Sequence, residues 1–270
     1  MVDAPALGAG GATRGGSSPS IRIAPMIKRL AEKIASQPER GVFVAASAAL
    51  VAAGVARSKR IETIAKPLVM LSIQAGLWRT RNQRPAADNA LLAVATTASF
   101  AGDWLMLEEE FAPNEKEADR WIVRGASAFA VNHVAMIALA IKLRARPRPT
   151  DFAARMPGLV EGLALLATRR HHLLMPLGSY SKLLALMSTT MAAPQLKTDS
   201  EQDSRLPGRL EIGGLSFLAS DGTILHRRIF LSEERPRAAA EAFVLASYCL
   251  AQRLLVDGLD AASVRVAAGR

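Results

Sequence analysis

The chain has a single cysteine, Cys249, among its 270 residues. One cysteine cannot form a disulfide within the chain and cannot build a metal site without other ligands. Histidine is also scarce, and the pair His171-His172 directly follows Arg169-Arg170 at the edge of an apolar block. We interpret this pair as facing lipid head groups, and we predict no metal site and no cofactor.

The sequence also lacks sustained alternation of apolar and polar residues, which argues against a β-sheet protein. Half of the residues are hydrophobic, and they gather in long blocks separated by short charged stretches. A helix needs about 20 apolar residues to cross a membrane, because each residue adds about 1.5 Å. Backbone polar groups in lipid must be satisfied within their own helix, so the pattern predicts an all-α, polytopic membrane bundle of about eight transmembrane helices. The blocks are 41–56, 61–78, 88–107, 121–141, 152–168, 172–193, 210–230 and 238–256.

The N-terminal part has no recognisable signal peptide. Residues 1–20 are rich in Gly, Ala, Ser and Pro, and we expect a disordered tail there. Residues 21–40 carry apolar side chains at helical spacing with Lys and Arg between them, which predicts a basic amphipathic juxtamembrane segment. A basic linker is the alternative. The transmembrane domain would then span 41–257, followed by a C-terminal tail at 258–270.

The formal net charge is +10, which in a soluble protein would favour nucleic-acid binding. Here the basic residues lie in loops between apolar blocks, as they do where membrane proteins meet anionic head groups. We therefore expect membrane lipids and no nucleic acid as partners. Eight spans would put both termini on the side richer in Lys and Arg. The positive-inside rule then predicts cytoplasmic termini and a plasma (cytoplasmic) membrane location.

Two aspartates, Asp103 and Asp221, lie well inside apolar blocks. A carboxylate within a span costs about 2.5–3.5 kcal/mol, and aspartate is too short to reach the interface. Each must face the bundle interior, a cation or water. One interpretation is a structural clamp between helices, for example Asp103 with Lys66. The other is that both acids line one polar pocket and divide the roles of proton donor and base.

Two further groups stand out inside the blocks. Lys66 precedes Pro67, and proline in a helix frees a carbonyl group and bends the chain. A lysine at such a bend suits an anion, a phosphate or an aspartate counter-ion. His133 lies alone in an apolar stretch, where a histidine is either a satisfied core group or a support for a catalytic acid.

The order and spacing of these residues resemble the YhhN family, whose animal members are lysoplasmalogenases. The resemblance covers about 60–256 and rests on several short motifs in order. They are Lys66-Pro67-Leu68, Phe100-x-Gly102-Asp103-x-Leu105-Met106, Phe129-x-x-x-His133, Pro176-x-x-x-Tyr180, Gly213-Gly214-x-x-Phe217-x-x-Ser220-Asp221-x-x-x-Leu225 and Tyr248-x-x-x-Gln252.

The resemblance implies an eight-helix membrane fold and hydrolysis of the vinyl-ether bond of lysoplasmalogens, with a lysophospholipid as the substrate. The products would be a fatty aldehyde and glycerophosphoethanolamine or glycerophosphocholine. It also implies that Asp103 and Asp221 are the catalytic residues. We expect supporting or substrate-binding roles for Lys66, His133, Tyr180, Tyr248 and Gln252.

The residue types suit this chemistry. A vinyl ether is hydrolysed by protonation at carbon, which requires a carboxylic acid, and by capture of the oxocarbenium ion with water, which a carboxylate can orient. Two alternatives remain open at this stage. A proton-coupled transporter would also hold intramembrane acids, and a non-catalytic scaffold would use them only as ion-pair partners.

Overall fold

The structure is a computed structural model that describes residues 36–198, 201 and 207–269. The chain divides into two units, 1–36 and 37–270, and the second unit is described here. The expected disordered tail at 1–20 and most of the juxtamembrane segment at 21–40 lie outside the described residues. The first described long helix begins at Pro38, inside that expected segment.

Eight helices of fourteen residues or more make up the described part of the second unit, which contains no β-strand, and the all-α prediction is confirmed there. Each helix coincides with one of the eight apolar blocks. They are α2 (Pro38–Val55), α3 (Lys59–Thr80), α4 (Ala86–Glu110), α5 (Glu115–Lys142), α7 (Met156–Arg169), α8 (Leu174–Met191), α10 (Arg209–Phe230) and α11 (Glu234–Ala268). Shorter elements are α6 (Pro149–Ala153), η1 (Arg81–Gln83), η2 (His171–Leu173) and η3 (Pro194–Leu196).

Four of these helices, α2, α4, α5 and α11, are long and apolar enough to cross a membrane. This supports an integral membrane protein. The remaining four are shorter or more polar. Helix α7, with 14 residues, would extend about 21 Å at 1.5 Å per residue, less than the roughly 30 Å hydrocarbon core. The number of long helices thus agrees with the prediction of about eight membrane spans. Length and composition support a membrane span for four of these helices.

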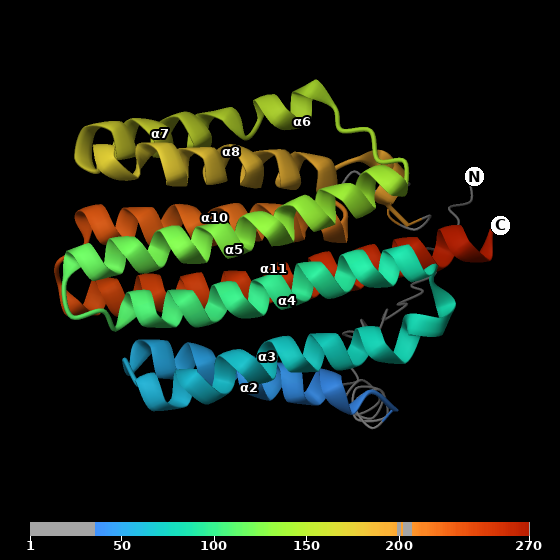
Figure 1. Cartoon of the computed structure of the whole chain (residues 1–270), viewed down its shortest axis with the longest axis horizontal. Helices are drawn as coiled ribbons and strands as arrows, with labels where there is room; N and C mark the ends of the chain where they lie inside the picture. Colours follow the sequence, from blue (N-terminus) through green and yellow to red (C-terminus); the bar gives the residue numbers. More distant parts are fainter. Residues whose placement is uncertain (1–35, 199–200, 202–206, 270) are drawn as a thin grey trace, which may run out of the picture. The chain divides into compact units, whose positions relative to one another are not determined.

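The helices pack as antiparallel pairs in chain order: α2 with α3, α4 with α5, α7 with α8, and α10 with α11. Short connections force this arrangement, since neighbours joined by a tight turn return alongside each other. Figure 1 shows that the turns within these four pairs lie at one end of the bundle. We call this end the hairpin end. At the hairpin end, residues that are far apart in the sequence lie beside one another.

Helix α11 is the central element of the packing, since it contacts α2, α3, α4, α5 and α10. It buries Leu245, Leu255 and Val256 among many others. Residues 258–268, which we placed in a C-terminal tail, continue α11 and bury Leu259 and Ala262. Buried side chains therefore occur along most of the length of α11.

Helix ends on the hairpin end are defined by local backbone chemistry. Asn114 caps α5 by accepting a hydrogen bond from the Glu117 N–H at 3.0 Å. Helix α2 ends at Val55, and Arg57 in the turn that follows adopts a left-handed conformation with φ of 51°. The Ser58 N–H then donates to the Ala53 carbonyl at 2.9 Å, which closes the final turn. Glycine usually occupies this position, so an arginine there is unusual.

Candidate active site

Asp103 lies in the second half of α4 and is only 7 % exposed. The hydroxyl group of Tyr248, from α11, interacts with its carboxylate. Gly102 makes room for this arrangement, because a Cβ atom there would lie 2.8 Å from the ring of Phe129 on α5. The absence of a side chain at 102 thus lets an aromatic ring pack beside the acid.

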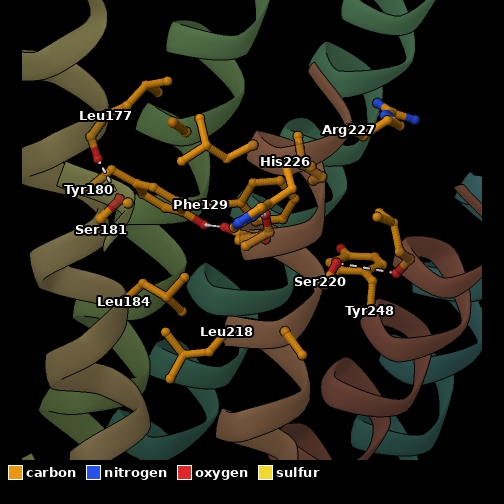
Figure 2. A pocket seen from close by; sticks show the side chains of 18 of the residues that line it. Phe129, Leu177, Tyr180, Ser181, Leu184, Leu218, Ser220, His226, Arg227 and Tyr248 are labelled. Carbon is orange, nitrogen blue, oxygen red and sulfur yellow. Dashed lines mark hydrogen bonds between the residues drawn. The ribbon is translucent and has the colours of Figure 1, made fainter. Parts of the chain in front are cut away.

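Asp221 lies in α10 and is paired with the chain's other tyrosine, Tyr180 of α8. The Tyr180 hydroxyl donates a hydrogen bond to Asp221 Oδ2 at 2.5 Å, and the dashed line from Tyr180 in Figure 2 marks this bond. The chain has two tyrosines in all. Each one is therefore committed to one of the two predicted catalytic aspartates.

Both aspartate–tyrosine pairs line the same cavity, which has a volume of about 430 Å³ and which we call the main cavity. This volume is in the usual range for a small-molecule site. Much of its wall is apolar, including Met106, Ile122, Phe129, Leu177, Leu184 and Leu218, and Figure 2 shows several of these side chains. The two acids thus line one largely apolar cavity. This is what we expect if they act together as proton donor and base.

Aromatic rings fill the space between the two pairs. Phe129 and Phe217 pack edge to face with a distance of 5.8 Å between ring centroids. The Tyr248 ring also packs edge to face on both, with its centroid 5.8 Å from that of Phe129 and 5.6 Å from that of Phe217. The His133 ring packs edge to face on Phe217 at 4.8 Å and stacks on Tyr180 at 5.5 Å. Ring contacts of this kind therefore link Tyr248, the partner of Asp103, to Tyr180, the partner of Asp221.

His133 is fully buried and does not line the main cavity. Its Nε2 atom lies 3.3 Å from the Tyr180 hydroxyl oxygen. Because the Tyr180 hydroxyl group donates its hydrogen bond to Asp221, its oxygen is the acceptor toward His133 in the tautomer that carries the hydrogen on Nε2. The predicted supporting role of His133 is thus geometrically possible through Tyr180, without direct contact with the acid.

Gln252 has the equivalent place beside the other pair. Its Nε2 group donates to the Tyr248 hydroxyl at 3.1 Å and to Ser99 Oγ at 3.0 Å. Like His133, it is fully buried and lies behind the cavity wall. Each acid therefore contacts a tyrosine hydroxyl group, and each hydroxyl group contacts a buried nitrogen donor. The nitrogen donor orients the hydroxyl group toward the acid.

Lys66 lines the main cavity, but its ion-pair partner is not Asp103. Its Nζ atom lies 3.2 Å from Glu62 Oε2, one turn earlier on α3, and the structure forms no ion pair between Lys66 and Asp103. The cation remains within electrostatic reach of Asp103. The clamp between Lys66 and Asp103 is therefore not formed, although the lysine still belongs to the same pocket.

Several charged residues in and beside the pocket were not predicted as site residues from the sequence, and Glu62, Arg155 and Arg227 are three of them. Glu62 is fully buried, and its spacing of four residues from Lys66 was the available signal. Arg155 and Arg227 line the cavity itself. Arg155 donates to Ser188 Oγ at 3.1 Å, to the Ser188 carbonyl and to the Asp151 carbonyl. Both arginines lie near helix ends, where sequence gives no reason to expect burial.

The arrangement brings together five of the seven predicted site residues around one cavity and puts the other two directly behind it. Among the described residues, no group of three or more His, Cys, Asp or Glu side chains is arranged to hold a metal ion. The site offers two carboxyl groups in apolar surroundings, each held by a tyrosine. Such a site can donate and accept protons near an apolar ligand.

The fold and site define a class: an all-helical protein with membrane-spanning candidates and an internal, carboxylate-lined apolar cavity. The YhhN family model matches residues 61–259, which include every predicted site residue. The chain belongs to the YhhN family, which includes lysoplasmalogenases. Comparisons with curated proteins and with solved structures give no match.

Proposed function

We propose that this protein is a membrane-embedded hydrolase that cleaves the vinyl-ether bond of lysoplasmalogens or a related ether lysolipid. The observation that carries the proposal is the pair of tyrosine-bound aspartates, Asp103 and Asp221, in one largely apolar cavity. Membership of a family that includes lysoplasmalogenases supports it. A lysolipid fits because its single hydrocarbon chain suits the apolar wall.

The two acids would act in sequence. Protonated Asp221 donates its proton to the second carbon of the alkenyl group, and the electron pair of the double bond forms the new C–H bond. The resulting oxocarbenium ion is captured at its first carbon by water, whose proton passes to ionised Asp103. The hemiacetal then collapses to the aldehyde and the glycerol hydroxyl group, and proton transfer restores both acids.

The environment favours this division of roles. Lys66 lies within electrostatic reach of Asp103, and a nearby cation stabilises an ionised carboxylate. Asp221 has the neutral Tyr180 hydroxyl as its hydrogen-bond partner. The logic is that of glycoside hydrolysis, in which two carboxyl groups in different surroundings divide the roles of acid and base.

The test uses purified protein in nanodiscs with lysoplasmenyl-ethanolamine or lysoplasmenyl-choline, and follows the free aldehyde by mass spectrometry. Wild-type protein should release aldehyde, whereas Asp103→Asn and Asp221→Asn should remain folded and lose turnover. In D₂O the aldehyde should gain one deuterium at its second carbon, because the proton is delivered to carbon. Absence of aldehyde from folded wild-type protein with both head groups would overturn the proposal and favour transport.

We further infer an integral protein of the cytoplasmic membrane, in which all eight long helices cross or enter the bilayer and the hairpin end faces outward. The four candidate spans support the membrane location. The orientation is supported by the sequence, in which the N-terminal segment and the alternate loops that would share its side carry more Lys and Arg than the others.

A further inference from the structure

The wall of the main cavity is exposed along two edges, one on each of two helices. The exposed wall residues are Ala154, Gly158 and Glu161, from α7 and the residues just before it, and Leu215, Ala219 and Gly222, from α10. The other residues of the wall are buried or half-buried. The main cavity therefore opens to the outside between α7 and α10, and we call this opening the mouth.

Helix α8 packs closely on both α7 and α10, whereas these two helices stay apart at the mouth. A Cβ atom added at Gly178 of α8 would lie 3.0 Å from Leu163 of α7. One added at Gly214 of α10 would lie 3.0 Å from the Ser188 Cα atom of α8. At Gly158, on the α7 edge of the mouth, an added Cβ atom would meet nothing within 4 Å. The gap between α7 and α10 can therefore widen without disturbing close packing.

Exposed apolar side chains flank the mouth on both helices. Val160 of α7 is 54 % exposed, and Ile212 and Leu215 of α10 are 39 % and 41 % exposed. Figure 1 shows α7 at one edge of the bundle, beside α8. In a membrane-embedded bundle, apolar side chains on such an outer surface lie against hydrocarbon. The mouth therefore connects the apolar main cavity with the interior of the bilayer.

A polar contact crosses the mouth. The Nε2 atom of His226 on α10 lies 3.0 Å from Oε1 of Glu161 on α7. The His226 ring is anchored on its own helix, because Nδ1 lies 2.8 Å from the Gly222 carbonyl oxygen. His226 comes after Asp221 on α10 and is closer to the hairpin end. A lipid whose head group stays at the hairpin end must pass this contact to bring its chain beside Asp221.

The second cavity, of about 320 Å³, lies at the hairpin end and offers the alternative entrance. Most of its wall residues are charged. It adjoins the main cavity at the ion pair of Arg227 with Glu241, whose side chains are 8 % and 7 % exposed. A hydrocarbon chain that entered there would have to strip water from charged groups without replacing their hydrogen bonds, which is costly. The mouth between α7 and α10 imposes no such cost.

We propose that the mouth is a lateral entrance, through which the hydrocarbon chain of a membrane lipid passes from the bilayer into the main cavity, and that the Glu161–His226 contact separates to admit it. The proposal rests on the proposed function in that the ligand is a lysolipid. A chain that enters here never leaves an apolar environment. It meets Asp221 first, because this acid is half-buried beside Gly222, whereas Asp103 is only 7 % exposed.

The first test locks the mouth. Glu161→Cys combined with His226→Cys puts one thiol on each side of it, and dibromobimane, a short bifunctional thiol reagent, joins the two. The native Cys249 is buried and should not react. Lys59→Cys combined with Glu108→Cys is the matched control. In this pair Lys59 Nζ lies 3.1 Å from Glu108 Oε2, between α3 and α4, and neither residue lines either cavity.

The readout of this test is entry of a lipid that cannot be cleaved. The probe is a saturated 1-alkyl lysophospholipid with a diazirine on its chain, in nanodiscs, and mass spectrometry follows photolabelling of the buried wall residue Leu184. Joining the thiols at the mouth should slow labelling at least about tenfold relative to the same protein before joining. Joining the control pair should leave the rate unchanged. Unchanged labelling with the mouth locked, or an equal loss in the control, would overturn the proposal.

The second test fills the mouth without a reagent. Gly158→Trp puts a large ring where an added Cβ atom meets nothing within 4 Å, so the fold should be kept. Val160→Trp is the matched control, because Val160 is exposed two residues further along and does not line the main cavity. Gly158→Trp should lower the rate of photolabelling and kcat/KM for lysoplasmenyl-ethanolamine about tenfold, whereas Val160→Trp should change neither.

The two readouts separate this proposal from the hydrolase itself. Equal labelling and equal turnover in the two folded tryptophan variants would overturn lateral entry and place the entrance at the second cavity. A wild-type protein that releases no aldehyde, yet loses photolabelling when the mouth is locked, would support the entrance and contradict the proposed hydrolysis.

Discussion

Tyr180 of α8 donates its hydroxyl hydrogen to Asp221 of α10 across 2.5 Å, and His133 of α5 contacts the same hydroxyl group. Three helices thus meet at one acidic group on the wall of the main cavity. Tyr248 and Gln252 repeat the arrangement beside Asp103. Each of the two acids is therefore held by a tyrosine on the wall of the same cavity.

Tyr180→Phe should lower kcat about ten- to hundredfold, because it removes a hydrogen bond that orients the Asp221 carboxyl group. The ring remains, so its stacking on His133 should be kept. Steady-state aldehyde release with a thermal unfolding curve is the measurement. Tyr248→Phe should behave similarly toward Asp103. Wild-type kcat in both folded variants would mean that the tyrosines do not position the acids.

Gly222→Leu should narrow the main cavity, since Gly222 lines it and a Cβ atom there would meet nothing within 4 Å. We expect kcat/KM for a long-chain lysolipid to fall at least about tenfold, with a smaller loss for a short-chain analogue. Gly222→Ala is the size control. An equal loss for both chain lengths would indicate that the hydrocarbon chain lies elsewhere.

Gly102→Ala should destabilise the protein by about 1–3 kcal/mol, because the new methyl group would lie 2.8 Å from the Phe129 ring. Gly158→Ala is the comparison, since nothing lies within 4 Å of a Cβ atom at that position. Midpoints of thermal unfolding in the same detergent measure the difference. Equal midpoints for the two variants would contradict the close packing of α4 on α5.

Lys66→Met should leave the Glu62 carboxylate buried without its cation, at a cost of about 3–5 kcal/mol. Adding Glu62→Gln should recover much of that loss, because the second change removes the stranded charge. The double-mutant cycle is read from thermal unfolding. Additive effects would show that Lys66 and Glu62 do not depend on each other.

An orientation with the hairpin end outside predicts that Lys116→Cys reacts with an impermeant maleimide in intact cells. Arg146→Cys, at the other end, should react only after permeabilisation. The single native Cys249 is buried, so its background labelling should be low. The opposite labelling pattern would reverse the inferred topology.

Much of the helical architecture is predictable because apolar blocks of this length have few other stable solutions. The blocks at 61–78 and 210–230 are recovered as α3 and α10, although both carry charged residues. Their membrane status was harder to predict, since hydropathy averages over faces that meet lipid and faces that meet other helices. Lys66 and Glu62 illustrate this, because their ion pair lies inside the bundle.

The sequence by itself determined that Asp103 and Asp221 are unusual. A short carboxylate within an apolar helix cannot reach water, so it must face a polar interior. Only the tertiary structure decided that each acid meets a tyrosine, that Lys66 pairs with Glu62, and that charged residues from several helix ends line a second cavity at the hairpin end. Helical periodicity identifies the buried face of each helix but not the partner that covers it, because partners are set by packing between segments distant in the chain.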